Sequence, residues 1–485
     1  MNFLSANFLQ FLPVALVLWY ATRHAERWRI LLMIIASLGF YGAHRGWFIA
    51  IILAYCVVDW GVGLLLQKRP TRVVLIAGIA FNLGVLSAWK YTPMLAQTLA
   101  EFAGWPPQAE AAELELHWIV PLGVSFYAFS GIAYMVDVYR GQTRAEPDFF
   151  RYTLFTVFFP HLIAGPILRA REFLWHLEPG RLPMRPDGVF EGTVLIARGA
   201  FKKAVLGDGI AVAIDPYFAN ISDPSIASVW ALPYLYLYAL QIYFDFSGYT
   251  DIARGLGLWF GFRWPENFDR PYLAASIRDF WRRWHMTLSR FLRDYLYVAL
   301  GGNRHGMART MLALLVTMAL GGLWHGASWS FMVWGALHGL YLVGNLLWSR
   351  SVPGRLLAQH GGVVWRVVSV MLTFHAVVLA WAFFRITEFD YALICLRAVF
   401  SFDPALAFAG GSAEQALWLL IATYAAGALA LRHLAGITGP EAMAARVTSL
   451  GLTTGLAIGG TLGLGLLSWL LAPGGDVPPF IYFQF

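Results

Sequence analysis

Long apolar stretches separated by short polar loops run through the whole chain. A bilayer core of about 30 Å needs about 20 apolar residues for each helical crossing. One stretch, 152–168, is short and contains Gly165 and Pro166, which favours a re-entrant segment buried in protein. The pattern predicts an all-α polytopic membrane protein with about 11 to 13 membrane segments, some of them re-entrant. The expected segments lie near residues 3–21, 30–43, 47–66, 73–91, 118–138, 152–168, 190–214, 229–260, 309–326, 328–348, 366–385, 416–432 and 448–471.

The composition agrees with a surface that faces lipid. The 485 residues are 59% hydrophobic and only 13% charged, whereas soluble chains carry about 25% charged residues. The two cysteines, Cys56 and Cys395, lie far apart in apolar surroundings. They predict buried apolar side chains, with no disulfide, metal site or redox pair. The first apolar stretch has no basic residue before it and no small-residue cleavage site after it, so we expect a membrane helix there and not a signal peptide.

The net charge of +7 is distributed in short loops between apolar stretches, which favours a membrane over nucleic acid as the partner. Loops rich in Arg and Lys alternate with loops that lack them. The stretch 92–117 has four Glu and no Lys or Arg. The positive-inside rule therefore places the amino terminus outside and the basic loops inside. The same parity puts Arg432 and Arg446 inside and the tail at Pro478 outside.

The chain reads as one membrane domain, 1–485, whose longest hydrophilic part is an Arg-rich cytoplasmic insertion, 263–309. Residues 279–296 predict a single amphipathic helix at the membrane surface, with His285 on its apolar side. Arg282 and Arg283 lie on the other side. They suit either anionic headgroups or a phosphorylated acyl donor such as coenzyme A, and the residues alone leave both open.

His325 is the strongest candidate for chemistry. It lies about 24 Å along an ideal helix from Arg309, with Gly322 and Gly326 nearby to let other groups approach the backbone. An ionisable residue at membrane depth indicates a functional site. A neutral imidazole there can take the proton from an acceptor hydroxyl as it attacks a thioester, a reaction that needs no metal. His285 is the best second group, either to orient the donor or to stabilise the oxyanion.

Other buried polar residues have simpler interpretations. Asp245 and Asp251 end an apolar stretch, and we expect each to be paired with Tyr, Ser or Arg, because an ionisable group at that depth costs at least ~2.5 kcal/mol. His338 is expected to be structural. His161, in the suspected re-entrant segment, is expected to line a tunnel.

Several motifs are concentrated in 241–339. They are Phe244 to Arg254, Pro265 to Phe268, Phe280 to His285, Leu296 to Arg304, and Leu323 to Gly326. These motifs resemble the membrane-bound O-acyltransferase family, and its bacterial alginate O-acetyltransferase branch most of all. The carboxyl-terminal sequence from Pro479 to Phe485 is also similar to that branch.

This resemblance implies a helical bundle with a transmembrane funnel or tunnel, where a cytoplasmic acyl donor meets an acceptor from outside. His325 would be the catalytic histidine and His285 its companion. The donor would be acetyl-CoA, with no bound cofactor. The residues expected to bind substrate or line the tunnel are Trp324, Trp284, Arg282, Arg283, Asp279, Asn267, Asp245, Tyr249, Ser328 and His161.

The family also implies a bacterial inner membrane, an exported polysaccharide and a periplasmic or membrane-anchored acetyltransferase as partner. Alginate, cellulose, peptidoglycan and teichoic acid are modified by similar branches. A transporter of a lipid-linked or acyl substrate is the alternative from another class. The paired, Gly/Pro-broken segments of an inverted repeat, which would favour transport, are not evident in the sequence. A non-catalytic scaffold for an export machine is a third reading.

Overall fold

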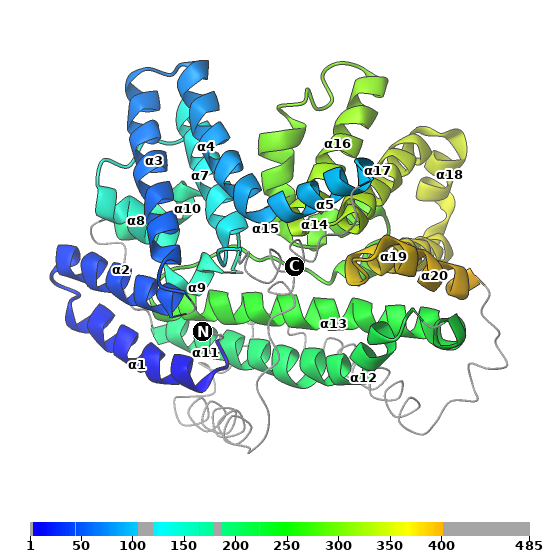
Figure 1. Ribbon diagram of the computed structural model, residues 1–485, viewed down its shortest axis with the longest axis horizontal. Helices are drawn as coiled ribbons and strands as arrows, with labels where there is room; N and C mark the ends of the chain where they lie inside the picture. Colours follow the sequence, from blue (N-terminus) through cyan, green and yellow to red (C-terminus); the bar gives the residue numbers. More distant parts are fainter. Residues whose placement is uncertain are drawn as a thin grey trace.

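The computed structural model describes residues 3–43, 45–104, 120–163, 165–178, 186–222 and 224–400. Within these ranges every regular element is a helix (Figure 1), which confirms the all-α class. The expected segments 416–432 and 448–471, Arg432, Arg446 and the carboxyl-terminal tail lie outside the described residues.

Five of the described helices are long and apolar enough to cross a membrane. The amino-terminal α1 is apolar but shorter, and the total of 11 to 13 segments stays a prediction. The five are α3 (Phe48–Lys68), α4 (Arg72–Lys90), α16 (Met307–His325), α17 (Trp329–Arg350) and α19 (Gly362–Arg385).

The amino-terminal part packs α3 and α4 against α7, while α1 and α2 lie at an angle to them (Figure 1). The chain turns at Phe158, between α8 and the four-residue α9 that has Pro160 in its first turn, so 152–168 is not one continuous helix. The break lies before Gly165 and Pro166, on which the expectation of a re-entrant segment rested. The remaining elements are α1 (Ala6–Ala21), α2 (Glu26–Gly42), α5 (Thr92–Phe102), α7 (Val124–Tyr139), α8 (Phe149–Val157), α9 (Phe159–Leu162), α10 (Ala170–Leu174) and η1 (Trp175–Leu177).

The middle of the chain is a long antiparallel pair. One member of this pair is α13 (Pro224–Trp259), as Figure 1 shows. Along it run α11 (Pro186–Ala200), the short π-helix η2 (Phe201–Gly207) and α12 (Asp208–Ala219). Glycines allow the close approach, since a Cβ on Gly192 would lie 2.8 Å from the Gly255 carbonyl oxygen. At 1.5 Å per residue α13 is about 54 Å long, more than the bilayer core needs.

The carboxyl-terminal part of the described chain is built around the hairpin of α16 and α17. Gly322 and Gly335 face each other across this hairpin, and a Cβ on Gly335 would clash with the carbonyl of Met318. The two backbones are therefore in direct contact. The other elements here are η3 (Pro271–Leu273), α14 (Ile277–Arg283), α15 (Met286–Phe291), the short π-helix η4 (Leu292–Tyr297), α18 (Val352–His360) and α20 (Phe389–Phe400).

The prediction of one amphipathic helix over 279–296 is wrong. The chain breaks between α14 and α15, where His285 adopts a left-handed backbone with φ of 40°. Tertiary hydrogen bonds explain the break. The Arg283 carbonyl accepts from Asp269 N at 2.9 Å, and Met286 N donates to the Asn267 carbonyl at 3.0 Å. The predicted direction of His285 is nevertheless confirmed, because its side chain is 0% exposed.

Candidate active site

His325 is the last residue of α16 and lies in a pocket of aromatic rings. Its ring packs edge-to-face on Trp334 of α17 and on Phe384 of α19, each with centroids 5.1 Å apart, and on Trp324 at 4.9 Å. The residue is 5% exposed. Three membrane helices therefore determine where this imidazole lies.

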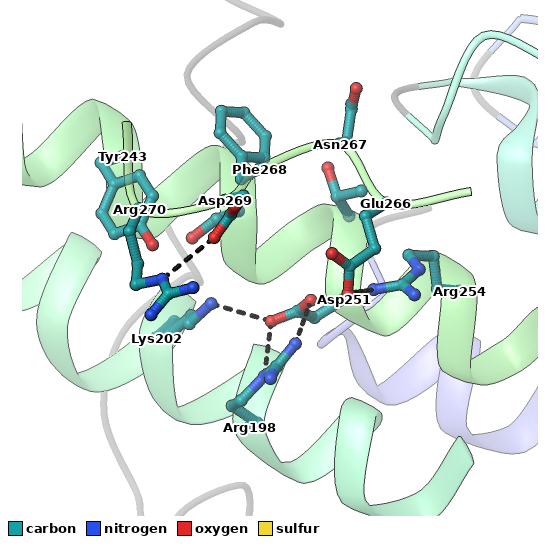
Figure 2. A pocket seen from close by; sticks show the side chains of 12 residues that line it. Arg198, Lys202, Tyr243, Asp251, Arg254, Glu266, Asn267, Phe268, Asp269 and Arg270 are labelled. Atoms are coloured by element: carbon teal, nitrogen blue, oxygen red, sulfur yellow. Dashed lines mark hydrogen bonds and ion pairs between the residues drawn. The ribbon is translucent and has the colours of Figure 1, made fainter. Parts of the chain in front are cut away.

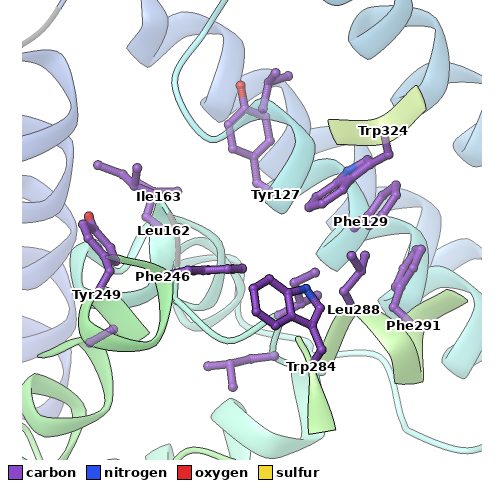
Figure 3. Packing of buried hydrophobic residues seen from close by; sticks show 14 of the residues in the cluster. Tyr127, Phe129, Leu162, Ile163, Phe246, Tyr249, Trp284, Leu288, Phe291 and Trp324 are labelled. Carbon is purple, nitrogen blue, oxygen red and sulfur yellow. The ribbon is translucent and has the colours of Figure 1, made fainter. Parts of the chain in front are cut away.

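His285 contacts the indole ring of Trp324, which also packs on His325. Its ring centroid lies 6.3 Å from that of Trp324 and 4.7 Å from that of Phe246, which meets it edge-on. Figure 3 shows Trp284, Trp324 and Phe246 among buried apolar residues drawn together from distant parts of the chain. The two histidines that the sequence singled out, forty residues apart, are thus brought together around Trp324.

Asn267 sets the protonated nitrogen of His285. The Asn267 Oδ1 accepts hydrogen bonds from the backbone N–H of Thr287 at 3.1 Å and from its hydroxyl at 2.9 Å. A backbone N–H can only donate, so this atom is the amide oxygen. His285 Nδ1, 3.1 Å away, must then carry a hydrogen and donate to it. The lone pair is left on Nε2, which has no hydrogen-bond partner among the residues the structure describes.

Burial lowers the pKa of His285 to about 3, so the ring is neutral near pH 7. A neutral ring whose Nδ1–H is already donated to Asn267 offers only an acceptor at Nε2. It can accept a hydrogen bond from an N–H or O–H group of a substrate, but it cannot donate one to an oxyanion. Of the two expected roles for His285, the geometry favours orientation of the acyl donor.

Trp324 offers the hydrogen that His285 lacks. Its indole Nε1–H is buried, and it has no acceptor among the described residues. Indole nitrogens are donors only, so this group is suited to the carbonyl oxygen of an acyl group placed between the two histidines.

Two residues that the sequence analysis missed hold the end of α16. Lys90, the last residue of α4, donates from Nζ to the carbonyls of Trp324 and His325, and Tyr91 donates to that of Leu323. A signal was present, because Lys90 stands at the end of a span where the following loop has no basic residue.

His338 belongs to the same aromatic cluster. It accepts a hydrogen bond at Nδ1 from Trp281 Nε1, at 3.3 Å, and its ring packs on Trp334 with centroids 4.9 Å apart. It lies close enough to His325 for a charge on one to act on the other, as do His285 and Lys90. These contacts suit the structural role that we expected.

The buried aspartates are paired. Asp251 forms a two-pronged ion pair with Arg198, at 2.6 and 2.8 Å, as expected for an Arg partner. Asp245 instead pairs with Lys203 of η2, at 2.7 Å, and that lysine also binds Asp208. Lys203 was not among the predicted partners. It lies in the π-helix η2, and side-chain periodicity does not reveal a π-helix.

A polar cavity of about 190 Å³ lies between α11, α13 and the loop 264–270 (Figure 2). Four basic and three acidic side chains line it, and most of them are paired with one another. Asp251 binds Arg198 and Lys202, and the pairs Arg254–Glu266 and Arg270–Asp269 complete the walls. Asn267 borders it and holds His285.

A second cavity, of about 390 Å³, lies between α14, η4, α16 and α17. Arg278, Arg293 and Arg350 line it, together with apolar residues that include Leu292 and Met318. Trp281, which binds His338, forms part of its wall.

Arg282, Arg283 and Asp279 do not line this second cavity. Arg282 is exposed, and Arg283 pairs with Asp279 at 3.0 Å. The two arginines that directly precede His285 in sequence therefore do not border this cavity.

The other candidates have structural contacts. Ser328 caps α17 by accepting from Ser330 N at 3.2 Å, and it donates to the Thr387 carbonyl at 2.8 Å. Tyr249 and His161 are buried, with Tyr249 stacked on Phe3 and His161 edge-on to Trp264. Among the described residues no group of three His, Cys, Asp or Glu has the arrangement of a metal site.

A helical membrane protein that buries two histidines around one tryptophan has the groups needed for acyl transfer between a thioester and a hydroxyl. The chain belongs to the membrane-bound O-acyltransferase family, whose model matches residues 140–384. It is therefore a multi-pass membrane enzyme that transfers acyl groups to oxygen.

Several bacterial proteins are similar to this chain, two of those named here over about three quarters of it or more. A probable alginate O-acetylase, AlgI, of Pseudomonas syringae pv. tomato is 38% identical over 83% of this chain and 76% of its own. The peptidoglycan O-acetyltransferase of Helicobacter pylori is 33% identical over 76% and 73%. The teichoic acid D-alanyltransferase of Bacillus subtilis is 30% identical but covers only 46% of this chain and 58% of its own.

Proposed function

We propose that this enzyme moves an acetyl group from cytoplasmic acetyl-CoA through the membrane for O-acetylation of an exported polysaccharide such as alginate. The observation that carries the proposal is the convergence of His325 and His285 on Trp324. The likeness to alginate O-acetylases supports the acetyl group and the polymer. We also propose the inner membrane of a bacterium as its location, which the bacterial origin of these relatives supports.

The reaction needs one proton transfer and one acyl transfer. In our mechanism the acceptor hydroxyl oxygen attacks the thioester carbonyl while His325 takes its proton as general base. Trp324 Nε1–H donates to the developing oxyanion, and His285 Nε2 accepts from a donor group of the substrate. The carbon–sulfur bond then breaks, and the departing thiolate takes the proton from His325.

The larger cavity supports a binding place for the donor. Its arginines, Arg278, Arg293 and Arg350, suit the phosphates of coenzyme A. Its apolar residues suit the pantetheine arm, and the wall at Trp281 leads toward His338 and His325. In this proposal the acyl donor is bound by arginines that border a cavity, in place of Arg282 and Arg283.

His325→Ala tests the mechanism. Loss of the base is expected to lower acetylation by at least about a hundredfold while membrane expression is unchanged. The readouts are polymer O-acetyl content in cells and transfer of labelled acetyl from acetyl-CoA in membrane vesicles. His285→Ala is expected to weaken transfer strongly.

His338→Ala is the matched control, because it removes an equally buried imidazole from the same cluster. It is expected to lower stability but to keep most of the turnover per folded molecule. Near-normal acetylation by His325→Ala would contradict the mechanism. Movement of substrate in liposomes without acyl turnover would favour the transporter.

We further propose that the amino terminus faces the periplasm and that a periplasmic or membrane-anchored acetyltransferase finishes the transfer. The alternating basic loops support the orientation. Peptidoglycan is the other acceptor supported by a relative, and purified polymers supplied to the vesicles distinguish the two.

A further inference from the structure

The helix that carries His325 ends abruptly. Its last residue is His325, and Gly326 follows in an extended conformation with φ of −162°. The carbonyls of the last turn of a helix have no N–H of the same helix to accept. In α16 these carbonyls are satisfied from another helix.

Lys90 and Tyr91 supply the missing donors. Lys90 Nζ lies 2.5 Å from the Trp324 carbonyl oxygen and 3.0 Å from that of His325, and the Tyr91 hydroxyl lies 2.9 Å from that of Leu323. Three successive carbonyls are thus held by two successive residues at the end of α4.

Lys90 is placed where a lysine is costly. It is the last residue of a candidate membrane span and only 8% exposed, and no carboxylate among the described residues pairs with it. A lysine at a helix end normally extends its side chain toward the headgroups. This one turns inward, to the negative end of the α16 dipole.

We infer that Lys90 is a positioning residue for the acyl-transfer step, and the inference rests on the proposed role of His325. By holding the Trp324 and His325 carbonyls, its ammonium group keeps the last turn of α16 in place. The imidazole base and the indole donor, which leave adjacent residues of that turn, are thereby held in register with each other and with His285.

The test compares Lys90→Met, which removes both hydrogen bonds at similar length, with Lys90→Arg, which can still donate to two carbonyls. The full-length protein is expressed in its host lacking the chromosomal gene, so that membrane vesicles contain the natural acceptors. The probe is labelled acetyl-CoA at varied concentration, and thermal unfolding in detergent reports on folding.

We expect Lys90→Met to lower kcat about tenfold to a hundredfold, as for displacement of a catalytic group by about 1 Å, with KM for acetyl-CoA within twofold. Lys90→Arg should restore most of kcat. Lys68→Met is the control, since Lys68 ends the neighbouring span α3 but is exposed, and it should behave as the natural enzyme.

Equal kcat in Lys90→Met and the natural enzyme would overturn the inference, as would a loss confined to KM or one that Lys90→Arg shares in full. If Lys90→Met fails to fold, Lys90→Gln, which keeps donors without charge, replaces it; its kcat should be below that of Lys90→Arg, and a kcat equal to that of the natural enzyme would overturn the inference. Near-normal activity in His325→Ala would instead overturn the proposed role of His325, and the absence of any acyl turnover in the natural protein would overturn the proposed function.

Discussion

At the scale of single residues, the state of His285 depends on one amide. Asn267 takes the hydrogen of Nδ1 and receives two more from Thr287, so the imidazole is oriented, neutral and left with an acceptor nitrogen. A histidine arranged in this way is coupled to pH through the stability of the fold as well as through catalysis.

The pH dependence of stability follows from the sign of the shift. Burial lowers the pKa of His285 to about 3, from 6.5 in the unfolded chain, so the unfolded chain binds the proton first. Stability from the neutral ring is present above about pH 6.5 and is lost as pH falls toward about 3, by at most about 1.4 kcal/mol per pH unit.

Thermal unfolding in detergent at pH 7.5 and pH 5 measures this effect. His285→Gln should show a smaller fall in midpoint on acidification than the natural protein. The exposed His305 serves as control, and His305→Gln should leave the fall unchanged. An equal fall in all three proteins would remove His285 as the source.

At the scale of elements, the contact between α16 and α17 places two of the three clustered histidines. A Cβ on Gly335 would clash with the Met318 carbonyl, so Gly335→Ala must push the two helices apart. Overpacking of this kind costs about 1 to 3 kcal/mol. We expect a lower unfolding midpoint together with reduced acetyl transfer.

Gly344→Ala is the matched control for this substitution. Gly344 lies in the same helix, and a Cβ there meets no atom within 4 Å. It should leave transfer unchanged and stability unchanged or slightly higher, because alanine favours the helix over glycine. Equal effects of the two substitutions would mean that the close contact is not what positions the site.

The same scale shows where sequence reasoning succeeded and where it stopped. Depth in an apolar span predicted that His325 is buried, and the helical wheel predicted that His285 points away from the cytoplasm; both residues are buried. The break at His285 was missed because it depends on backbone bonds from Asn267 and Asp269. Periodicity reports side-chain faces and contains no information on such partners.

Partners that lie far apart in the chain were missed for a related reason. Lys90 donates to the Trp324 carbonyl, more than two hundred residues away in sequence. Lys203, in the π-helix η2, forms an ion pair with Asp245. The residue types were visible in the sequence, whereas the pairing requires the packing of α4 on the end of α16 and of η2 on α13.

At the scale of the whole molecule, orientation in the membrane can be read by labelling. Cys56 and Cys395 are the only cysteines and both are buried, so introduced thiols have a low background. Phe102→Cys, at an exposed end of α5, should react with an impermeant maleimide in intact spheroplasts. Gln142→Cys, exposed beside Arg140 and Arg144, should react only after permeabilisation.

Labelling of Gln142→Cys in intact spheroplasts, with protection of Phe102→Cys, would reverse the proposed orientation. It would also place the donor cavity and the basic loops on the outer side, where acetyl-CoA is absent. The two cysteines control each other, since each should be accessible from one side only.

The glycine contact between α16 and α17 has a consequence for which acyl groups this enzyme accepts. Because the backbones of α16 and α17 are in direct contact, the hairpin that carries His325 and His338 can move only as one rigid unit. Phe129 of α7 and Phe291 of α15 lie outside this hairpin, and Phe129 stacks on Phe291 at 4.0 Å and on Trp324 at 5.1 Å. If a longer acyl chain is to fit beside Trp324, we expect the substitutions that admit it at Phe129 and Phe291 and not within the hairpin.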